Sequence, residues 1–158
     1  MKIIQYENRY AEDFKRLNVS WIKKYFNDIE SADLEIFDHI EQWLEKGSMI
    51  YFAVENDIVY ATCMIIPLDG EVWEICKLAA DDRYKGKGAG NAVFQACTDY
   101  AIKKGAKKIT LISNHILKPA LHIYEKNGFQ KTDLRFNDFA RGDVQYDLDI
   151  SRKENTLQ

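Results

Sequence analysis

The chain has 158 residues, a formal net charge of −3 and 46% hydrophobic residues. This length fits one domain, and the composition is that of a globular protein, which excludes disordered and fibrous classes. The acidic balance argues against broad nucleic-acid binding, because such binding requires a basic face. No apolar run approaches the length of a membrane span, so we expect a cytoplasmic protein with no membrane contact. A single domain is expected over residues 1–150, followed by a polar tail at 151–158.

The first quarter of the chain predicts a short strand and two helices. Residues 2–6 form the expected strand, and residues 10–26 repeat apolar side chains at helical spacing. Residues 31–46 also repeat apolar side chains at helical spacing, and Gly47 is the expected C-terminal end of that helix. We therefore expect two helices that each bury one apolar side.

Three strands are expected next, at residues 49–55, 58–66 and 72–80. The first two are joined by Asn56 and Asp57, a pair that tolerates tight hairpin geometry. Residues 67–70 then turn the chain into the third strand. Together these segments predict an antiparallel meander.

Three cysteines lie inside these and later apolar segments: Cys63, Cys76 and Cys97. Their spacing matches no metal-binding or disulfide pattern. We therefore expect all three to be reduced, buried core residues, as is usual in a cytosolic protein, and we expect no metal.

A basic glycine turn follows the third strand of the meander. Gly86, Gly88 and Gly90 allow a tight turn and close approach of a ligand, since none of them has a Cβ atom. The next residues are apolar at intervals of three and four, so the turn opens a helix whose positive end can bind an anion. Arg83, Lys85 and Lys87 add three cations within five residues. The alternative interpretation is a solvated turn that merely begins a helix.

The rest of the chain predicts a strand, a helix and two closing strands. A strand at 107–113 after the long helix implies a crossover and a locally parallel strand pair. A helix at 117–127 ends before Gly128, and strands are expected at 129–136 and 143–150. The element order predicts an α+β fold with a mixed sheet.

Two segments together resemble the GNAT superfamily of acetyl-coenzyme A dependent N-acetyltransferases. The stretch from Arg83 to Gly90 is similar to the family's Arg/Gln-x-x-Gly-x-Gly/Ala pyrophosphate loop. Asn114 and the later Tyr124-Glu-Lys-Asn-Gly-Phe129 are similar to the family's next strand and helix. The resemblance implies a mixed, mostly antiparallel sheet of six to seven strands, flanked by about four helices and splayed between the fourth and fifth strands.

The resemblance also implies acetyl-CoA as co-substrate and assigns residues to it. Backbone groups of Leu78 and Ala80 would meet the pantetheine arm and the acetyl carbonyl, and Asn114 would hydrogen-bond the pantetheine. The whole expected cofactor set is Leu78, Ala80, Arg83, Tyr84, Lys85, Gly86, Lys87, Gly88, Ala89, Gly90, Asn114 and Lys126. The chain departs from the family pattern where Val-x-Pro is common, because it has Ala80-Asp81-Asp82 there. Both aspartates are expected to face solvent or to pair with cations of the loop.

Two residues are expected to carry proton transfers. The resemblance implies that Tyr124 protonates the leaving thiolate; the alternative is a core aromatic with a satisfied hydroxyl. The attacking amine must lose a proton, and Glu74 is the expected base, directly or through water. Its alternative is a carboxylate paired with Lys77 or another cation. His39, His115 and His122 are rival bases, with His115 the better rival because it adjoins Asn114.

The resemblance implies an acceptor site between the first helices and the loop joining the last two strands. That region offers Trp21, Tyr25, Asp33, Arg141 and Asp143. Trp21, Tyr25 and Arg141 are the expected substrate contacts, since Arg141 could hold a carboxylate in bidentate fashion. A structural ion pair of Arg141 with Asp143 or Glu74 is the alternative.

The resulting hypothesis is direct transfer of an acetyl group, in a ternary complex, to the primary amine of a small metabolite or amino acid. No covalent enzyme intermediate is expected, because neither Cys76 nor Cys97 has an adjacent partner that would activate it. A non-catalytic acyl-CoA sensor and a protein or peptide N-acetyltransferase are the alternatives. Exposed closing strands are compatible with a homodimer.

Overall fold

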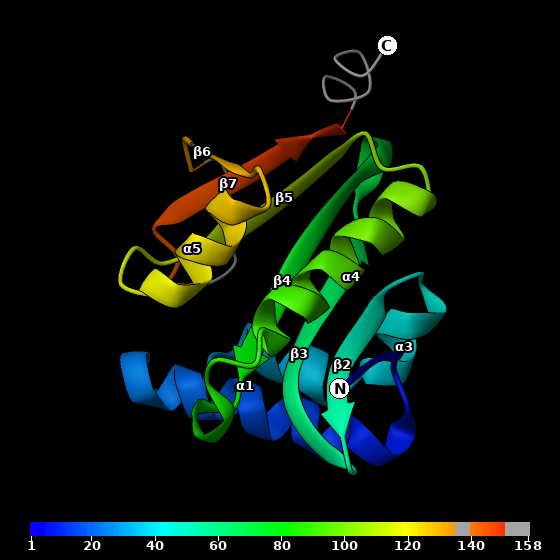
Figure 1. Ribbon diagram of the computed structural model, residues 1–158. Coiled ribbons are helices and arrows are strands. Elements are labelled where there is room, and N and C mark those ends of the chain that lie inside the picture. Colours follow the sequence, from blue (N-terminus) through cyan, green and yellow to red (C-terminus); the bar gives the residue numbers. More distant parts are fainter. Residues whose placement is uncertain (135–139, 151–158) are drawn as a thin grey trace.

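A computed structural model describes residues 1–134 and 140–150, which form one mixed sheet of seven strands in the order β1-β2-β3-β4-β5-β7-β6 (Figure 1). The strands are β1 (Lys2–Gln5), β2 (Met49–Glu55), β3 (Ile58–Pro67), β4 (Val72–Ala80), β5 (Lys108–Ser113), β6 (Gln130–Thr132) and β7 (Val144–Asp149). The helices are α1 (Ala11–Phe26), α2 (Ser31–Phe37), α3 (Ile40–Glu45), α4 (Ala89–Lys103) and α5 (Lys118–Lys126). Short 3-10 turns span Asn8–Tyr10, Asp69–Glu71 and Asp82–Tyr84. The predicted α+β class is confirmed.

The sheet opens between β4 and β5, its one parallel pair among the described strands. Residues 72–74 of β4 pair with residues 108–110 of β5. Beyond Glu74 and Thr110 the two strands diverge, as Figure 1 shows. The predicted splay therefore lies where the C-terminal halves of these strands separate.

Each face of the sheet has its own hydrophobic core. Helix α4 covers one face, where Val93, Phe94 and Cys97 pack with Ile75 and Ile109. Helices α1, α2 and α3 cover the other face, and their apolar side chains surround Phe52 and Met64. The two cores hold β4 between them, so its side chains reach both faces.

Local turn chemistry accounts for the antiparallel half of the sheet. Asn56 and Asp57 have φ angles of 51° and 61°, the left-handed pair that a two-residue hairpin requires. Strands β2, β3 and β4 pair antiparallel in sequence order. The predicted meander is confirmed.

The single helix predicted at 31–46 is wrong, because the structure divides this segment into α2 and α3. The Asp38 amide closes the last turn of α2, and His39 has a φ of −135° and a ψ of 34°, outside the helical region. Phe37 and Ile40 are buried in the same core on either side of the break. Tertiary burial therefore prevails over a continuous helical pattern, and the described residues form five helices, in keeping with the expected number of about four.

The first closing strand is shorter than predicted. Strand β6 covers Gln130–Thr132, and Phe129 lies before it, buried against Phe94. Residues 135 and 136 of the predicted strand, and the predicted tail at 151–158, lie outside the described residues.

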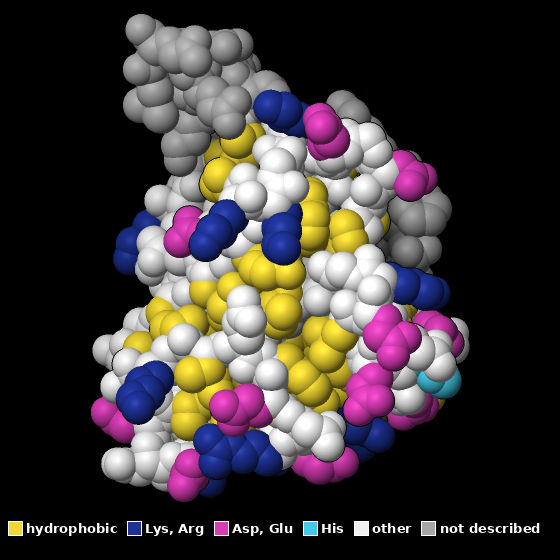
Figure 2. All heavy atoms as spheres, turned by 90° about the vertical axis from the view of Figure 1, so that its right-hand side faces the viewer, with side chains coloured by type: hydrophobic (Ala, Val, Ile, Leu, Met, Phe, Trp, Pro, Cys, Tyr) yellow, Lys and Arg dark blue, Asp and Glu magenta, His cyan; other side chains and the backbone are white. Residues whose placement is uncertain are grey.

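The face shown in Figure 2 carries apolar side chains in its middle, with lysine, arginine and acidic side chains around them. Within the described part of the chain, no helix combines the length and apolar character needed to cross a membrane.

Candidate active site

A cleft occupies the opening between β4 and β5. Its walls come from β4, the end of β5, the first turns of α4 and α5, the C-terminal turn of α1, and the loop before β7. The lining includes Ile75 to Ala80, Ile112 to Asn114, Gly90, Ile123, Tyr124, Trp21, Tyr25, Phe26, Arg141 and Gly142. Because the cleft follows the splay of the sheet, one continuous space runs from Gly90, the last glycine of the turn, to the aromatic end of α1.

The glycine turn forms an anion cradle at one end of this cleft. Gly86 and Gly88 have φ angles of 83° and 73°, and a Cβ built on either meets no described atom within 4 Å. Gly88 is the N-cap of α4, so no side chain covers the first amides of the helix, and its first turn contains no acidic residue. Exposed N–H groups at a helix N-terminus favour an anionic ligand. This geometry fits a diphosphate.

The next glycine acts by close packing. A Cβ at Gly90 would lie 3.4 Å from the Cδ1 atom of Ile123 on α5. Ala89 beside it is buried in the core. The start of α4 and helix α5 are thus close together where they line the cleft.

The three cations of the turn, Arg83, Lys85 and Lys87, differ in how they are paired with acidic side chains. Arg83 turns back to Asp81, with an Nη2–Oδ2 distance of 2.7 Å and an Nε–Oδ1 distance of 3.1 Å. The Lys87 ammonium is 4.0 Å from a Glu55 oxygen and its side chain is 46% exposed. Lys85 is exposed, and Tyr84 packs on Tyr60 with ring centroids 4.5 Å apart.

The two aspartates that depart from the family pattern both pair with cations. Asp81 is buried, receives the Arg83 backbone amide at 3.0 Å and caps the 3-10 turn. The hydrogen bonds from Arg83 lower the pKa of Asp81 to about 2 although burial opposes this. Asp82 is exposed and pairs with Lys24 of α1 at 3.1 Å, a cation outside the loop. The expectation that these aspartates face solvent or pair with loop cations is therefore met in two ways, since Asp81 is buried and pairs with Arg83 and Asp82 is exposed.

Tyr124 points into the cleft from α5. Its hydroxyl donates to the Ser113 Oγ atom at 3.4 Å, and its ring packs against Phe94 and Tyr146 with centroids 5.5 Å apart. Burial raises the pKa of Tyr124 far above its usual value, so the hydroxyl keeps its proton at neutral pH.

Asn114 links the end of β5 to the loop before β7. Its Nδ2 group donates to the Arg141 carbonyl at 2.6 Å, and its Oδ1 atom accepts from the Ile116 amide at 3.0 Å. The side chain that was expected to contact pantetheine therefore holds two segments of the cleft wall together.

The four candidate bases, Glu74, His39, His115 and His122, lie on different elements around the cleft. Glu74 is half-buried in the paired part of β4, one residue before the cleft lining begins at Ile75. His115 is exposed, with its Nδ1 atom 2.5 Å from the Asp143 carboxylate. His39 and His122 are exposed on α3's N-terminal side and on α5. The cleft lining includes neither Glu74 nor any of these histidines within the described residues.

Lys126, expected to contact the cofactor, is exposed in the last turn of α5. It is not among the described residues that line the cleft.

Cys76 corrects the expectation that all three thiols are fully buried. Cys63 and Cys97 are buried, whereas Cys76 is half-buried and lines the cleft. Burial of its sulfur, followed by the nearby charge of Glu74, raises the pKa of the Cys76 thiol well above its usual value. A raised pKa keeps the thiol protonated and makes it a weak nucleophile.

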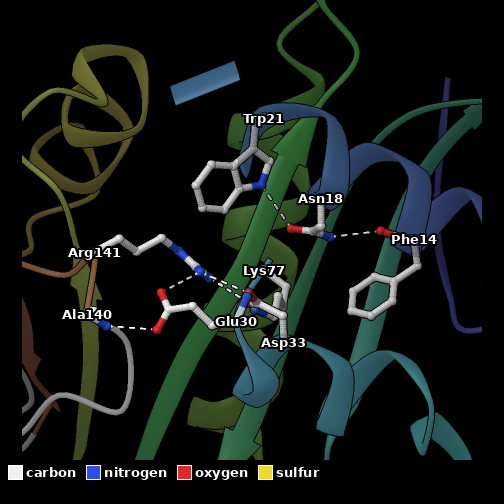
Figure 3. A network of polar contacts seen from close by, with 8 residues as sticks. All are labelled: Phe14, Asn18, Trp21, Glu30, Asp33, Lys77, Ala140 and Arg141. Carbon is white, nitrogen blue, oxygen red and sulfur yellow. Dashed lines mark hydrogen bonds and ion pairs between the residues drawn. The ribbon is translucent and has the colours of Figure 1, made fainter. Parts of the chain in front are cut away.

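Lys77 and Arg141, which line the cleft, belong to a charge network with Glu30 and Asp33 (Figure 3). The Arg141 guanidinium contacts Glu30 at 2.9 Å and Asp33 at 2.9 and 2.5 Å. Lys77 of β4 donates to the same Asp33 carboxylate. Burial alone would raise the pKa of Asp33, but the Arg141 and Lys77 interactions lower it overall. Arg141 therefore pairs with residues of α2 and its N-cap, while the expected partner Asp143 pairs with His115.

One aromatic side chain of α1 is fixed against this network. Buried Asn18 accepts the Trp21 indole N–H at 3.0 Å and donates to the Phe14 carbonyl at 2.9 Å. The Arg141 guanidinium carbon lies 5.5 Å from the centre of a Trp21 ring. Figure 3 shows the ring above the arginine, which comes from a distant part of the chain.

Sequence reasoning missed Lys77, Asn18 and Glu30. Lys77 has a φ of 56° at a register irregularity between β3 and β4, and no local pattern marks this position. Glu30 and Asp33 form a reciprocal cap at the start of α2, which their three-residue spacing could have indicated. Asn18 could have been noticed as a polar residue inside the apolar stripe of α1.

Comparison with known proteins gives a consistent result. A family model described as the acetyltransferase (GNAT) family matches residues 12–129. The chain is 36% identical over 129 residues to the uncharacterized N-acetyltransferase YhfO of Bacillus subtilis, covering 78% of each chain. It is 25% identical over 97 residues to human N-acetyltransferase 8B, a match that spans 58% of this chain and 43% of the human protein. A GNAT-family acetyltransferase from Staphylococcus aureus Mu50 has the same fold, with a TM-score of 0.85, 22% identity, and coverage of 94% of this chain and 98% of that one.

Proposed function

The chain belongs to the GNAT family of acetyltransferases, and on this basis we propose that it transfers an acetyl group directly to the primary amine of a small metabolite. As a member of this family it is an N-acetyltransferase that uses acetyl-CoA. The observation that carries the proposal is that Gly90, Tyr124 and Trp21 line the same cleft. In this one cleft an acetyl donor could bind near Gly90, Tyr124 could supply a proton, and an amine acceptor could bind near Trp21.

Acetyl-CoA supplies the activated acetyl thioester, and residues of the glycine turn would hold its diphosphate. The amides at the start of α4 and the exposed Lys85 and Lys87 provide donors of the required charge. Arg83 contributes by fixing the turn through Asp81, since its guanidinium is already paired. The half of β4 from Leu78 to Ala80, which faces the splay, would offer backbone groups to the pantetheine arm.

Tyr124 is assigned the role of acid. When the amine nitrogen attacks the carbonyl carbon, the carbon–sulfur bond breaks and the sulfur needs a proton. The buried Tyr124 hydroxyl holds one at neutral pH, and the Ser113 hydroxyl orients it. A phenol in this position is a suitable general acid for a thiolate.

Glu74 is assigned the role of base, acting through water. Glu74 directly precedes Ile75, where the cleft lining on β4 begins, and is not itself in that lining, so a direct contact with an acceptor in the cleft is not the arrangement we favour. A bridging water would carry the proton from the ammonium to the carboxylate. His115 is the rival, and its pairing with Asp143 gives it a fixed orientation.

Transfer in a ternary complex fits the state of Cys76. A covalent acetyl-cysteine route would need a thiolate, and burial together with the charge of Glu74 raises the pKa of this thiol. We therefore assign no covalent step to it.

The proposal is tested by acceptor-dependent release of free coenzyme A thiol, with mass spectrometry of the product. Small amines, amino acids and peptides are supplied with acetyl-CoA to the full chain and to Glu74→Gln and His115→Gln variants. We expect an N-acetylated small amine, and about a 100-fold loss of kcat at neutral pH for Glu74→Gln only. Acetylation of peptides alone would instead assign a protein-modifying role, and tight acetyl-CoA binding without any turnover would assign a sensor.

We also propose that the protein forms a homodimer. The apolar area in the middle of the face in Figure 2 is compatible with it. Light scattering of the purified chain over a range of concentrations would determine the mass in solution.

A further inference from the structure

The geometry points to a more specific acceptor: we infer that the preferred substrate is an amine with an aromatic or other apolar body and no carboxylate. This inference rests on the proposed transferase function and concerns the end of the cleft formed by α1 and the Arg141 network. Three observations carry it.

The first observation is that the charges of the Arg141 network are already paired with one another. Among the residues that the structure describes, the network has the cations Arg141 and Lys77 and the anions Glu30 and Asp33, and the four side chains are no more than 28% exposed. Both terminal nitrogens of Arg141 contact carboxylates at 2.5 to 2.9 Å. A substrate carboxylate would have to displace one of these anions or add a third negative charge beside side chains that are mostly buried, and either costs free energy.

The second observation is that the surface beside the network is aromatic. Trp21, Tyr25 and Phe26 line the cleft there, and the Trp21 and Phe26 rings meet edge to face with centroids 6.1 Å apart. Aromatic walls of this kind bind apolar and aromatic bodies with defined geometry.

The third observation is that this wall is held in place before any ligand binds. The Asn18 side chain accepts the Trp21 indole N–H, and Asn18 itself is fully buried. Arg141 lies against the Trp21 ring at 5.5 Å and is fixed by two carboxylates. A preorganised aromatic surface lowers the entropy cost of binding, which favours a rigid apolar body.

These observations give each part of the substrate a place. The apolar body packs on Trp21 and its neighbours, and the amine faces β4 and Tyr124 across the same cleft. Arg141 then serves as a structural wall beside the acceptor and does not anchor a substrate carboxylate.

The test compares matched acceptors that differ only at the carboxyl position. The panel is 2-phenylethylamine, phenylalaninamide and phenylalanine, with tryptamine, tryptophanamide and tryptophan as a second set. The amides retain the substituent but carry no negative charge, so they separate charge from size. Because the carboxamide also lowers the pKa of the amine, kcat/KM is compared per unprotonated amine. We expect kcat/KM for each amine and amide to exceed that of its amino acid by about tenfold or more.

A variant pair tests the aromatic wall. Trp21→Ala should raise KM for 2-phenylethylamine by about tenfold with little change in kcat, and Trp21→Phe should restore most of the affinity. Trp43→Ala is the matched control, since Trp43 packs in the core around α3 and does not line the cleft. Its KM should equal that of the parent.

Calorimetric titration with acetyl-CoA, done first, separates the two levels of the proposal. Failure to bind acetyl-CoA would overturn the proposed function. Binding followed by a ratio below about tenfold, by a preference for the amino acids, or by no acetylation of this panel while another small amine is acetylated would overturn this inference alone.

Discussion

The two ends of the cleft are built in different ways. At the glycine end, backbone amides and two left-handed glycines form the cradle, and the lysines around it are exposed. At the other end, charged side chains from α2, β4 and the loop before β7 are buried together, and Arg141 reaches a residue 111 positions earlier in the chain. A cradle of backbone tolerates side-chain replacement but not a change in backbone conformation. A buried charge network depends on each side chain, because removing one charge leaves its partner unpaired. Substitutions at the two ends should therefore have different effects.

The largest expected effect is on the free energy of unfolding when the central carboxylate is removed. Asp33→Ala leaves Lys77 and Arg141 nearly buried without this partner, which should cost about 3–5 kcal/mol. The matched control is Asp82→Ala, because Asp82 makes one ion pair while 63% exposed. Urea unfolding should place this control within about 0.5 kcal/mol of the parent. Equal losses in the two variants would contradict the distinction between the ends.

The next largest effect is expected on kcat, from a substitution of Tyr124, which lines the cleft between its two ends. Tyr124→Phe removes the proposed acid while keeping the ring in its aromatic cluster, so kcat should fall by about 100-fold. Acetyl-CoA affinity and the melting temperature should change little. Tyr100→Phe is the control, since Tyr100 lies on α4 outside the cleft lining. If Tyr124→Phe kept the kcat of the parent, Tyr124 would not be the general acid.

A smaller effect is expected from the ion pair that fixes the glycine turn. The pKa of Asp81 is lowered to about 2 by Arg83, so its stabilising contribution is present above the unfolded pKa near 3.9 and is lost as pH falls toward 2. Asp81→Asn should therefore cost about 1–2 kcal/mol at pH 7, and less as pH falls from 4 to 2. Chemical unfolding of both proteins across this pH range measures the difference. A gap that widens on acidification would contradict the assignment.

The smallest effect on stability is expected at the cradle itself, where binding is the informative measurement. Gly88→Ala and Gly105→Ala both place a Cβ on a left-handed residue, with φ of 73° and 96°, at a cost of about 1 kcal/mol each. Only Gly88 caps the helix that begins the cradle, so only its variant should weaken acetyl-CoA binding, by about tenfold. Equal affinities in the two variants would show that the cradle does not hold the cofactor.

The sequence predicts well those features that depend on neighbours in the chain. The hairpin at Asn56 and Asp57, the strand–turn–helix around Gly88 and the parallel pair of β4 with β5 each follow from local turn chemistry and element order. The strand–turn–helix and the parallel strand pair also determine where the glycine end of the cleft lies in the fold.

The features that sequence reasoning missed depend on long-range contacts. The break between α2 and α3 follows from burial of residues on both sides of His39, which a continuous helical pattern conceals. The partners of Arg141 lie 108 to 111 residues away, so spacing could not identify them. Lys77 has a left-handed backbone conformation and pairs with Asp33 of α2, and no glycine or asparagine at this position indicates that conformation in the sequence.

The most direct test of the central claim is a calorimetric titration of the full chain with acetyl-CoA, with Gly88→Ala and Gly105→Ala beside it. We predict saturable binding of one acetyl-CoA per chain, weakened about tenfold in Gly88→Ala and unchanged in Gly105→Ala. No saturable binding to the parent chain would contradict the claim that the glycine end of the cleft holds the acetyl donor.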